Sequence, residues 1–188
     1  MQAPGGSDED LEDGFEHGGW QMDFDSDDTG NDAGIIAQWE SKVEALLLGR
    51  KTYQIWEGAW GVWPEDAPGL TGEFTRRYNR VTKFVASSTL AADDLSWKNS
   101  VLLGDDLGAA VAELRQRPGG EIRVWGSSVL IRSLAEQNLV DEYRLLIYPI
   151  ILGTGKKLFP DGFPASTLKL ISSRPLPSGV VVNIYERA

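Results

Sequence analysis

Hydrophobic residues follow two different periods along the chain, and these periods predict its elements. Residues 45–48 form an uncharged apolar run that is too short for a helix, which predicts a strand buried on both faces. Just upstream, Ile35, Trp39 and Val43 recur at helical spacing and predict a short amphipathic helix. By the same reasoning we expect strands at 81–86, 101–103 and 122–125, and helices at 53–60, 72–80, 107–114 and 129–137.

The pattern changes after Glu142, where strands follow one another without intervening helices. Residues 143–152, 168–172 and 180–185 read as strands joined by Pro- and Gly-containing connections, which indicates an antiparallel ending. The sequence therefore predicts an α/β fold of three layers. A mostly parallel central sheet would carry helices on both faces and an antiparallel C-terminal hairpin at its edge. In such sheets, ligands bind at the carboxyl ends of the strands.

The first of these strand ends carries the sequence Gly49-Arg50-Lys51-Thr52. Glycine lets a ligand approach the backbone closely, and the two cations and the N-terminus of the next helix all favour an anion. Thr52 is a candidate cap for that helix. The turn therefore suits a phosphate ester. The alternative is an ordinary strand-to-helix turn in which the two cations are solvated.

Two further strand ends carry hydroxyl groups. Ser87 and Ser88 follow the strand at 81–86, and Gly126-Ser127-Ser128 connects the strand at 122–125 to a helix. In the second turn, the serines and the first helical N–H groups are possible donors to an oxyanion. A hydroxyl-rich turn without a ligand is the alternative for the first. The three spaced glycines of the standard dinucleotide fingerprint are absent from the sequence.

The composition indicates one soluble globular domain over residues 1–188, with no cysteine for disulfides or thiolate metal sites. The net charge of −10 arises at the N-terminus, because residues 1–32 contain eleven acids and no base, leaving 17 acids and 18 bases beyond. We therefore expect no nucleic-acid partner. No apolar run approaches the length of a membrane helix, and no secretory signal is visible, so we expect a cytoplasmic protein without a membrane partner.

Residues 1–34 form an acidic segment in which several aromatic residues are embedded, and we expect this loop to dock on the fold. Asp23, Asp25 and Asp27 alternate as in a calcium loop, but the glycine and glutamate that complete such a loop do not stand at the right positions. His17 is the only histidine, and we expect it on the surface of a loop. The sequence therefore predicts no metal site.

The three strand ends, in this order and spacing, resemble the dihydrofolate reductase-like superfamily. In detail the chain is similar to the RibD C-terminal reductase domain, the second domain of a bifunctional deaminase-reductase of riboflavin synthesis. The likeness covers nearly the whole chain. It includes the motifs at residues 3–6, 18–20, 47–53, 124–128, 139–142 and 149–156.

The resemblance implies NADPH as cofactor. It also implies that Arg50 and Thr52 hold phosphates, that Ser87 and Ser88 lie near the adenosine phosphate, and that Gly126–Ser128 cradle the pyrophosphate. An arginine fork with clustered hydroxyl groups suits the additional 2′-phosphate of NADPH, whereas a carboxylate commonly binds the ribose of NADH.

The chain departs from the family at its beginning. Family members start with an interior strand, commonly closing on Ser-x-Asp-Gly, before the Pro-Gly-Gly loop, and this chain starts at that loop. We therefore expect the first strand to be missing and two neighbouring strands to lack a partner unless another segment replaces it. Because the missing segment also carries substrate-facing residues, no catalytic residue is assigned.

The resulting hypothesis is an NADPH-dependent reductase acting on a small heterocyclic or carbonyl substrate. Trp20, Tyr53 and Trp60 are candidates for the wall of the substrate site, although aromatic residues also serve as core. The resemblance makes a homodimer plausible. The alternatives are a pterin or folate reductase, which needs a carboxylate to supply a proton, and a non-catalytic nucleotide-binding scaffold.

Overall fold

The computed structural model describes residues 1–24 and 32–188, and its backbone groups into two compact units. One unit comprises Met1–Ile36 and Val140–Ala188, and the other comprises Ala37–Leu139. We call them the antiparallel unit and the parallel unit after their sheets. That residues 1–188 form one domain stays a prediction.

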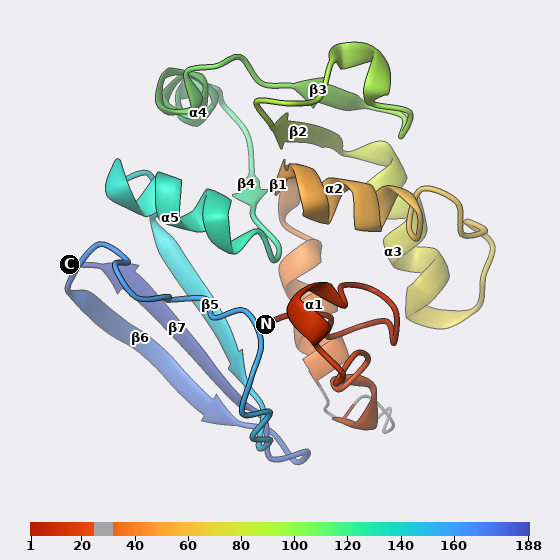
Figure 1. Cartoon of the computed structure of the whole chain (residues 1–188), viewed down its shortest axis with the longest axis vertical. Helices are drawn as coiled ribbons and strands as arrows, with labels where there is room; N and C mark the ends of the chain where they lie inside the picture. Colours follow the sequence, from red (N-terminus) through yellow and green to blue (C-terminus); the bar gives the residue numbers. More distant parts are fainter. Residues whose placement is uncertain (25–31) are drawn as a thin grey trace. The chain divides into compact units, whose positions relative to one another are not determined.

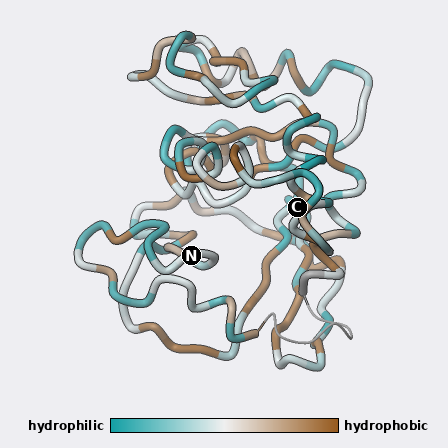
Figure 2. Tube along the Cα trace, turned by 90° about the vertical axis from the view of Figure 1, so that its right-hand side faces the viewer, coloured by the Kyte–Doolittle hydropathy of each residue, from teal (hydrophilic) through white to brown (hydrophobic). Residues whose placement is uncertain are grey.

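The parallel unit contains four strands among the described residues, β1 (Val43–Gly49), β2 (Thr82–Ala86), β3 (Ser100–Leu102) and β4 (Glu121–Arg123). They pair in the order β3-β2-β1-β4, and every pair is parallel (Figure 1). Leu46 and Leu48 of β1 are fully buried, as expected for an apolar strand with neighbours on both sides. The predicted strands are confirmed to within a few residues. Figure 2 shows apolar stretches (brown) alternating with polar ones (teal) along the backbone.

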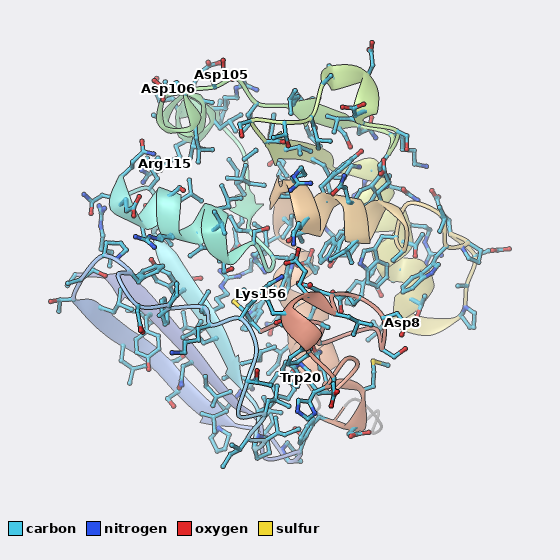
Figure 3. The ribbon with its side chains drawn as sticks, in the orientation of Figure 1. Asp8, Trp20, Asp105, Asp106, Arg115 and Lys156 are labelled. Atoms are coloured by element: carbon cyan, nitrogen blue, oxygen red, sulfur yellow. The ribbon has the colours of Figure 1, made fainter. Side chains whose placement is uncertain are left out.

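Helices connect these strands. They are α1 (Asp32–Glu40), which spans the boundary between the units, α2 (Arg50–Glu57), α3 (Gly69–Arg80), α4 (Leu107–Gln116) and α5 (Ser128–Glu136). Helix α4 begins at Leu107, as predicted. Asp106, labelled in Figure 3, caps it, because its side chain accepts a hydrogen bond of 2.9 Å from the backbone N–H of Ala109. Helix α2 differs from the prediction. It begins at Arg50, so Thr52 lies within its first turn and does not cap it.

The core of the parallel unit is largely aromatic on one side. Tyr78, 2% exposed, is in ring contact with Trp56 at 5.0 Å and with Trp60 at 5.2 Å between centroids. Trp60 also contacts Trp63 and Phe74. The aromatic residues after α2 are thus used to pack α2 against α3, which is the core role that the sequence left open.

The antiparallel unit contains strands β5 (Glu142–Ile147), β6 (Leu168–Pro175) and β7 (Val181–Arg187). Their order is β5-β7-β6, and they lie side by side in Figure 1. The antiparallel ending is therefore confirmed, but its strands form a sheet of their own. Strand β5 ends earlier than predicted, where the N–H of Ile150 turns back to the carbonyl of Tyr148 and Pro149 has no N–H to donate. Among the described strands, β3 and β4 end one sheet, and β5 and β6 end the other.

The acidic N-terminal loop docks within the antiparallel unit. Gln2 is 4% exposed, and its side-chain oxygen accepts a hydrogen bond of 3.0 Å from the backbone N–H of Lys156. The ammonium group of Lys156 pairs with Asp10 and Glu12. Trp20 donates its indole N–H to the carbonyl of Gln2 at 2.9 Å. Figure 3 labels Trp20 and Lys156 in this unit. These bonds, together with the one from the N–H of Gly19 to the carbonyl of Ala3, hold the motifs at 3–6, 18–20 and 149–156 against one another.

One glycine of this loop is required by packing. A Cβ atom at Gly18 would lie 2.1 Å from the carbonyl oxygen of Ser7, which no side chain tolerates. Two aromatic residues anchor the same loop, since Phe15 is 4% exposed and Trp20 packs edge-on against Tyr148. His17 is exposed and lies beside Phe15. In the described part of the chain, no helix is long and apolar enough to cross a membrane.

Candidate functional site

Two turns of the parallel unit meet at the carboxyl ends of β1 and β4. We call them the first turn (residues 49–52) and the second turn (residues 126–128). The backbone N–H of Gly49 donates to the hydroxyl oxygen of Ser127 at 3.0 Å, and that hydroxyl donates to the hydroxyl of Thr52 at 2.9 Å. The sequence separation is 75 to 78 residues. Two of the three predicted strand ends are thus joined by direct hydrogen bonds.

The meeting point is the topological switch of the sheet. The chain leaves β1 toward β2 on one side, whereas β4 is added on the other side of β1. Connections that leave neighbouring strands in opposite directions open a crevice at the strand carboxyl ends, where ligands of α/β proteins bind. Gly49 and Ser127 stand at this point of the sheet.

Both helices that start here have N-termini without a side-chain cap. Gly49 is the N-cap of α2 and has no side chain, and Ser127 is the N-cap of α5 but does not use its hydroxyl as a cap. A helix N-terminus that no side chain caps can donate its first-turn N–H groups to an oxyanion, which the positive end of the helix dipole also favours. Helix α4, which follows β3, is instead capped by Asp106.

Cations at the start of α2 strengthen this preference for an anion. Arg50 and Lys51 are the first two residues of the helix, both are exposed, and no acid occupies the first turn. Positive side chains at the positive end of a helix dipole are unfavourable, whereas negative ones are favourable there. An anionic ligand would remove this unfavourable arrangement.

The second turn has an unusual backbone. Gly126 and Ser127 are both left-handed, with φ of 56° and 54°. Glycine adopts this conformation freely, but for serine it is strained. A Cβ atom at Gly126 would come to 3.4 Å from the hydroxyl oxygen of Thr52, which is ordinary contact, so the glycine is favoured by its backbone conformation and not by lack of space.

The third predicted strand end follows β2. Ala86 pairs with Gly49 in the parallel register, so Ser87 and Ser88 come next to the first turn at the same edge of the sheet. The hydroxyl of Ser87 accepts hydrogen bonds from the N–H groups of Thr89 and Leu90, at 3.1 and 3.0 Å, and shapes its own turn. Ser88 is exposed. Of the two serines, Ser88 therefore has the side chain better placed to reach a ligand.

The candidates for the substrate wall have different positions. Tyr53 has no exposed surface, and its hydroxyl donates to Glu57 at 2.9 Å and accepts from the N–H of Trp97 at 3.1 Å. We therefore correct its role to a core residue that ties α2 to the segment before β3. Trp60 is partly exposed within the aromatic cluster. Trp20 belongs to the antiparallel unit.

A buried carboxylate behind the second turn escaped the sequence analysis. Glu40, at the end of α1, is fully buried and accepts a hydrogen bond of 2.8 Å from the indole N–H of Trp125, the residue before Gly126. Burial raises the pKa of Glu40, opposed by this hydrogen bond and by the charge of Arg123, 3.5 Å away. The nearby signal in the sequence is the helical spacing of Ile35, Trp39 and Val43, which are all buried, but this pattern does not place Glu40 inside.

Among the described residues, no group of three or more His, Cys, Asp or Glu side chains comes together as a metal site would require. The calcium-like alternation of Asp23, Asp25 and Asp27 lies largely outside the described residues.

Comparison with known proteins places this site in a family context. The uncharacterized protein YyaP of Bacillus subtilis (strain 168) is 32% identical over 145 residues, which cover 77% of this chain and 74% of YyaP. A crystal structure of a protein from Shewanella sp. PV-4, provisionally assigned to riboflavin biosynthesis, superposes with a TM-score of 0.68 at 22% identity. The match covers 88% of this chain and 87% of that chain. A pyrimidine reductase-like protein of Corynebacterium diphtheriae gives a TM-score of 0.56 at 15% identity, with coverages of 89% and 84%.

These structural neighbours have the dihydrofolate reductase-like fold, and the fold predicted from the sequence is confirmed. The family model of the RibD C-terminal domain matches residues 16–182, which include both turns and the parallel sheet. That family is a family of reductases. The chain therefore belongs to the RibD C-terminal domain family.

Proposed function

We propose that the chain is an NADPH-dependent reductase whose substrate is a small heterocyclic or carbonyl compound similar to 5-amino-6-(5-phosphoribosylamino)uracil. Membership in a reductase family supports the reaction class. The observation that carries the cofactor proposal is the convergence of two helix N-termini without side-chain caps at the switch point, with Arg50 and Lys51 on one of them.

The residues present fit a dinucleotide diphosphate. Gly49 and Gly126 let the backbone approach a phosphate closely, and the first-turn N–H groups of α2 and α5 would donate to its oxygens. Thr52 and Ser127 hold the two turns together by their hydrogen bond. Gly126–Ser128 would bind the pyrophosphate, and Arg50 and Lys51 would neutralise its charge.

The choice of NADPH over NADH rests on the residues beside the first turn. Arg50 is exposed at the start of α2, and Ser87 and Ser88 follow the neighbouring strand. A guanidinium group with nearby hydroxyls suits a phosphate dianion, and Ser87 and Ser88, not a carboxylate, stand directly after β2.

When bound, the nicotinamide supplies the hydride. The contribution of the chain is binding and orientation. The two turns would fix the phosphates, and the rigid sheet behind them would hold the cofactor at one position relative to the substrate. Such a reaction requires few catalytic side chains.

The proposal is tested by titrating the full chain with NADPH and with NADH while following tryptophan fluorescence. We expect Arg50→Ala to weaken NADPH binding by about 1.5–3 kcal/mol, because a charge-assisted contact is lost, and to weaken NADH binding less. Arg132→Ala is a matched control, since Arg132 lies on exposed surface of α5 and pairs with Glu136.

Three outcomes would contradict parts of the proposal. Binding of neither nucleotide by the wild type would refute the reductase. Equal weakening of both nucleotides by Arg50→Ala would show that Arg50 does not bind the 2′-phosphate. Tight binding without oxidation of NADPH over a panel of pyrimidine, pterin and carbonyl substrates would favour a nucleotide-binding scaffold.

We also propose that the chain forms a homodimer through the antiparallel sheet. Apolar residues on one face of this sheet are exposed, including Ile147 and Leu170. Exposed apolar patches of this kind are typical of subunit interfaces.

A further inference from the structure

A second charged site lies at the amino ends of the parallel strands, whereas the two turns lie at the carboxyl ends. It is a groove of about 580 Å³, which is large enough for a small metabolite. We call it the basic groove. Its lining residues are Glu65, Glu73, Arg76, Arg77, Asn79, Arg80, Lys98 and Asn99.

The position of the basic groove follows from the chain order. Arg80 ends α3 just before β2 begins at Thr82, and Lys98 and Asn99 come just before β3 begins at Ser100. Because both strands are parallel, these residues lie at the amino ends of the strands. The two turns lie at the carboxyl ends, so the basic groove is separate from the proposed cofactor site.

One wall of the groove is a stripe of charges on α3. Glu73, Arg76, Arg77 and Arg80 are spaced by three and four residues, which places them on one face of the helix. The opposite face packs inward through Thr75 and Tyr78, which are 0% and 2% exposed. The fold therefore fixes the direction in which the arginines project.

The other wall is held rigidly against the end of α3. Asn99 is left-handed, with a φ of 60°, and its side-chain amide donates to the carbonyls of Asn79 and Arg80 at 2.9 and 3.4 Å. The side chain of Asn79 is 5% exposed and donates to Glu65 at 2.9 Å. Lys98, next to Asn99, pairs with Glu65 at 2.7 Å.

A structural explanation for the arginines is that they complement the carbonyl end of α3. That end already has donors, however. The ammonium group of Lys83 donates to the carbonyls of Tyr78 and Val81 at 2.7 and 3.0 Å, and Asn99 donates to the carbonyls named above. The guanidinium groups of Arg77 and Arg80 are therefore not needed as caps for these carbonyls.

The groove is positively charged within an acidic protein. Four cations and two carboxylates line it. Lys98 and Glu65 pair with each other, so the excess positive charge comes from the arginines, of which Arg77 also donates a long hydrogen bond of 3.5 Å to the carbonyl of Val43. Burial, and to a lesser extent the nearby charge of Lys98, lower the pKa of Lys83 to about 8.

We propose that the basic groove binds a small phosphate-bearing polyanion through Arg77, Arg80 and Lys98. Arginine forks bind phosphate oxygens in pairs, and Asn99 adds a neutral donor beside them. The volume of the groove accommodates a diphosphate or a phosphorylated metabolite, whereas its narrow charged stripe on one helix does not extend into a surface for nucleic acid.

The experiment is isothermal titration of the full chain with inorganic pyrophosphate. We expect R77Q/R80Q to weaken binding by at least about tenfold, as expected for lost charge-assisted contacts. The control R117Q/R132Q removes two exposed arginines that pair with Glu113 and Glu136, so it makes the same change in net charge elsewhere. The control should bind pyrophosphate as the wild type does.

The single variant R50Q separates the basic groove from the proposed cofactor site, because pyrophosphate could bind at either. We expect R50Q to retain the component of binding that R77Q/R80Q loses. Loss of all binding in R50Q, an equal loss in R117Q/R132Q, or no loss in R77Q/R80Q would each overturn the proposal. Failure of NADPH binding would leave these outcomes unchanged.

A second measurement does not depend on the stability of a variant. In ¹H–¹⁵N spectra of the wild type, added pyrophosphate should shift the side-chain amide signals of Asn79 and Asn99. Shifts confined to the backbone amides of Gly49, Gly126 and Ser127 would also refute the basic groove as the binding site.

Discussion

At the scale of single residues, the buried lysine of β2 is the most unusual feature of the parallel unit. Lys83 is 0% exposed, and its ammonium group lies 4.5 Å from the ring of Trp97 and is bonded to two carbonyls at the end of α3. These contacts compensate part of the cost of burying a charge. The remaining cost appears as a pKa lowered from 10.5 to about 8.

The lowered pKa predicts a pH dependence of stability. Between pH 8 and 10.5 the unfolded chain retains a proton at Lys83 that the folded chain releases, so the free energy of unfolding rises with pH through that window. The cost of burying the charged lysine is present in full below about pH 8 and has disappeared above 10.5. Lys83→Met should remove this rise, as measured by urea unfolding at several pH values. Parallel curves for the two proteins would contradict the expectation.

Burial also shifts the pKa of Glu40, but it raises this pKa, whereas it lowers that of Lys83. The ionisation of Glu40 therefore opposes folding as pH increases, whereas its hydrogen bond to Trp125 favours the charged form. A residue of this kind is hard to predict from a sequence, since a glutamate at the end of an amphipathic helix usually faces water.

At the scale of elements, the hydroxyl of Ser127 links two turns that are far apart in sequence. It accepts from the N–H of Gly49 and donates to Thr52, so it is the only side chain among the bonds described for these turns that serves both. The positions of α2 and α5 relative to each other therefore depend on one oxygen atom as well as on packing against β1.

We predict that Ser127→Ala destabilises the chain by about 1–3 kcal/mol, because two hydrogen bonds are lost and the Gly49 N–H loses its acceptor. Thr52→Val is the matched control, since it removes only the bond between the hydroxyls and keeps the side chain similar in size. Chemical unfolding of both variants measures the difference. Equal destabilisation would show that the Gly49 bond contributes nothing.

The sequence predicts the elements and the strand ends well, because an apolar run closed by Gly or Ser is a local signal. Gly49 and Gly126 could be assigned to turns without knowing their partners. The hydrogen bond from Ser127 to Thr52 could not be predicted from the sequence, since it depends on which strand lies beside β1. The burial of Tyr53 is not predictable in this way, because it depends on contacts with Glu57 and with Trp97, which is distant in the sequence.

At the scale of the whole molecule, one face of the antiparallel sheet leaves apolar side chains exposed. Tyr143, Leu145 and Ile147 alternate along β5 on this face, and the register places Leu170 of β6 on it through Tyr185. Ile147 and Leu170 remain 51% and 53% exposed. A second copy of the chain would cover them.

We therefore predict that light scattering gives twice the 20.6 kDa of one chain, and that I147E/L170E gives a monomer. The control Val62→Glu adds a charge at an exposed apolar residue of the parallel unit and should leave the mass unchanged. A wild-type monomer would contradict the dimer. A dimeric I147E/L170E variant would show that another surface forms it.

The left-handed backbone at Ser127 also has a consequence for protein engineering. Glycine would occupy this position without the strain of about 1–3 kcal/mol that a side chain incurs there. Selection for heat resistance alone would thus tend to replace the serine, provided that relief of strain exceeds the loss of its bonds. Retaining the serine should be a constraint in any stabilised version that is meant to keep its ligand.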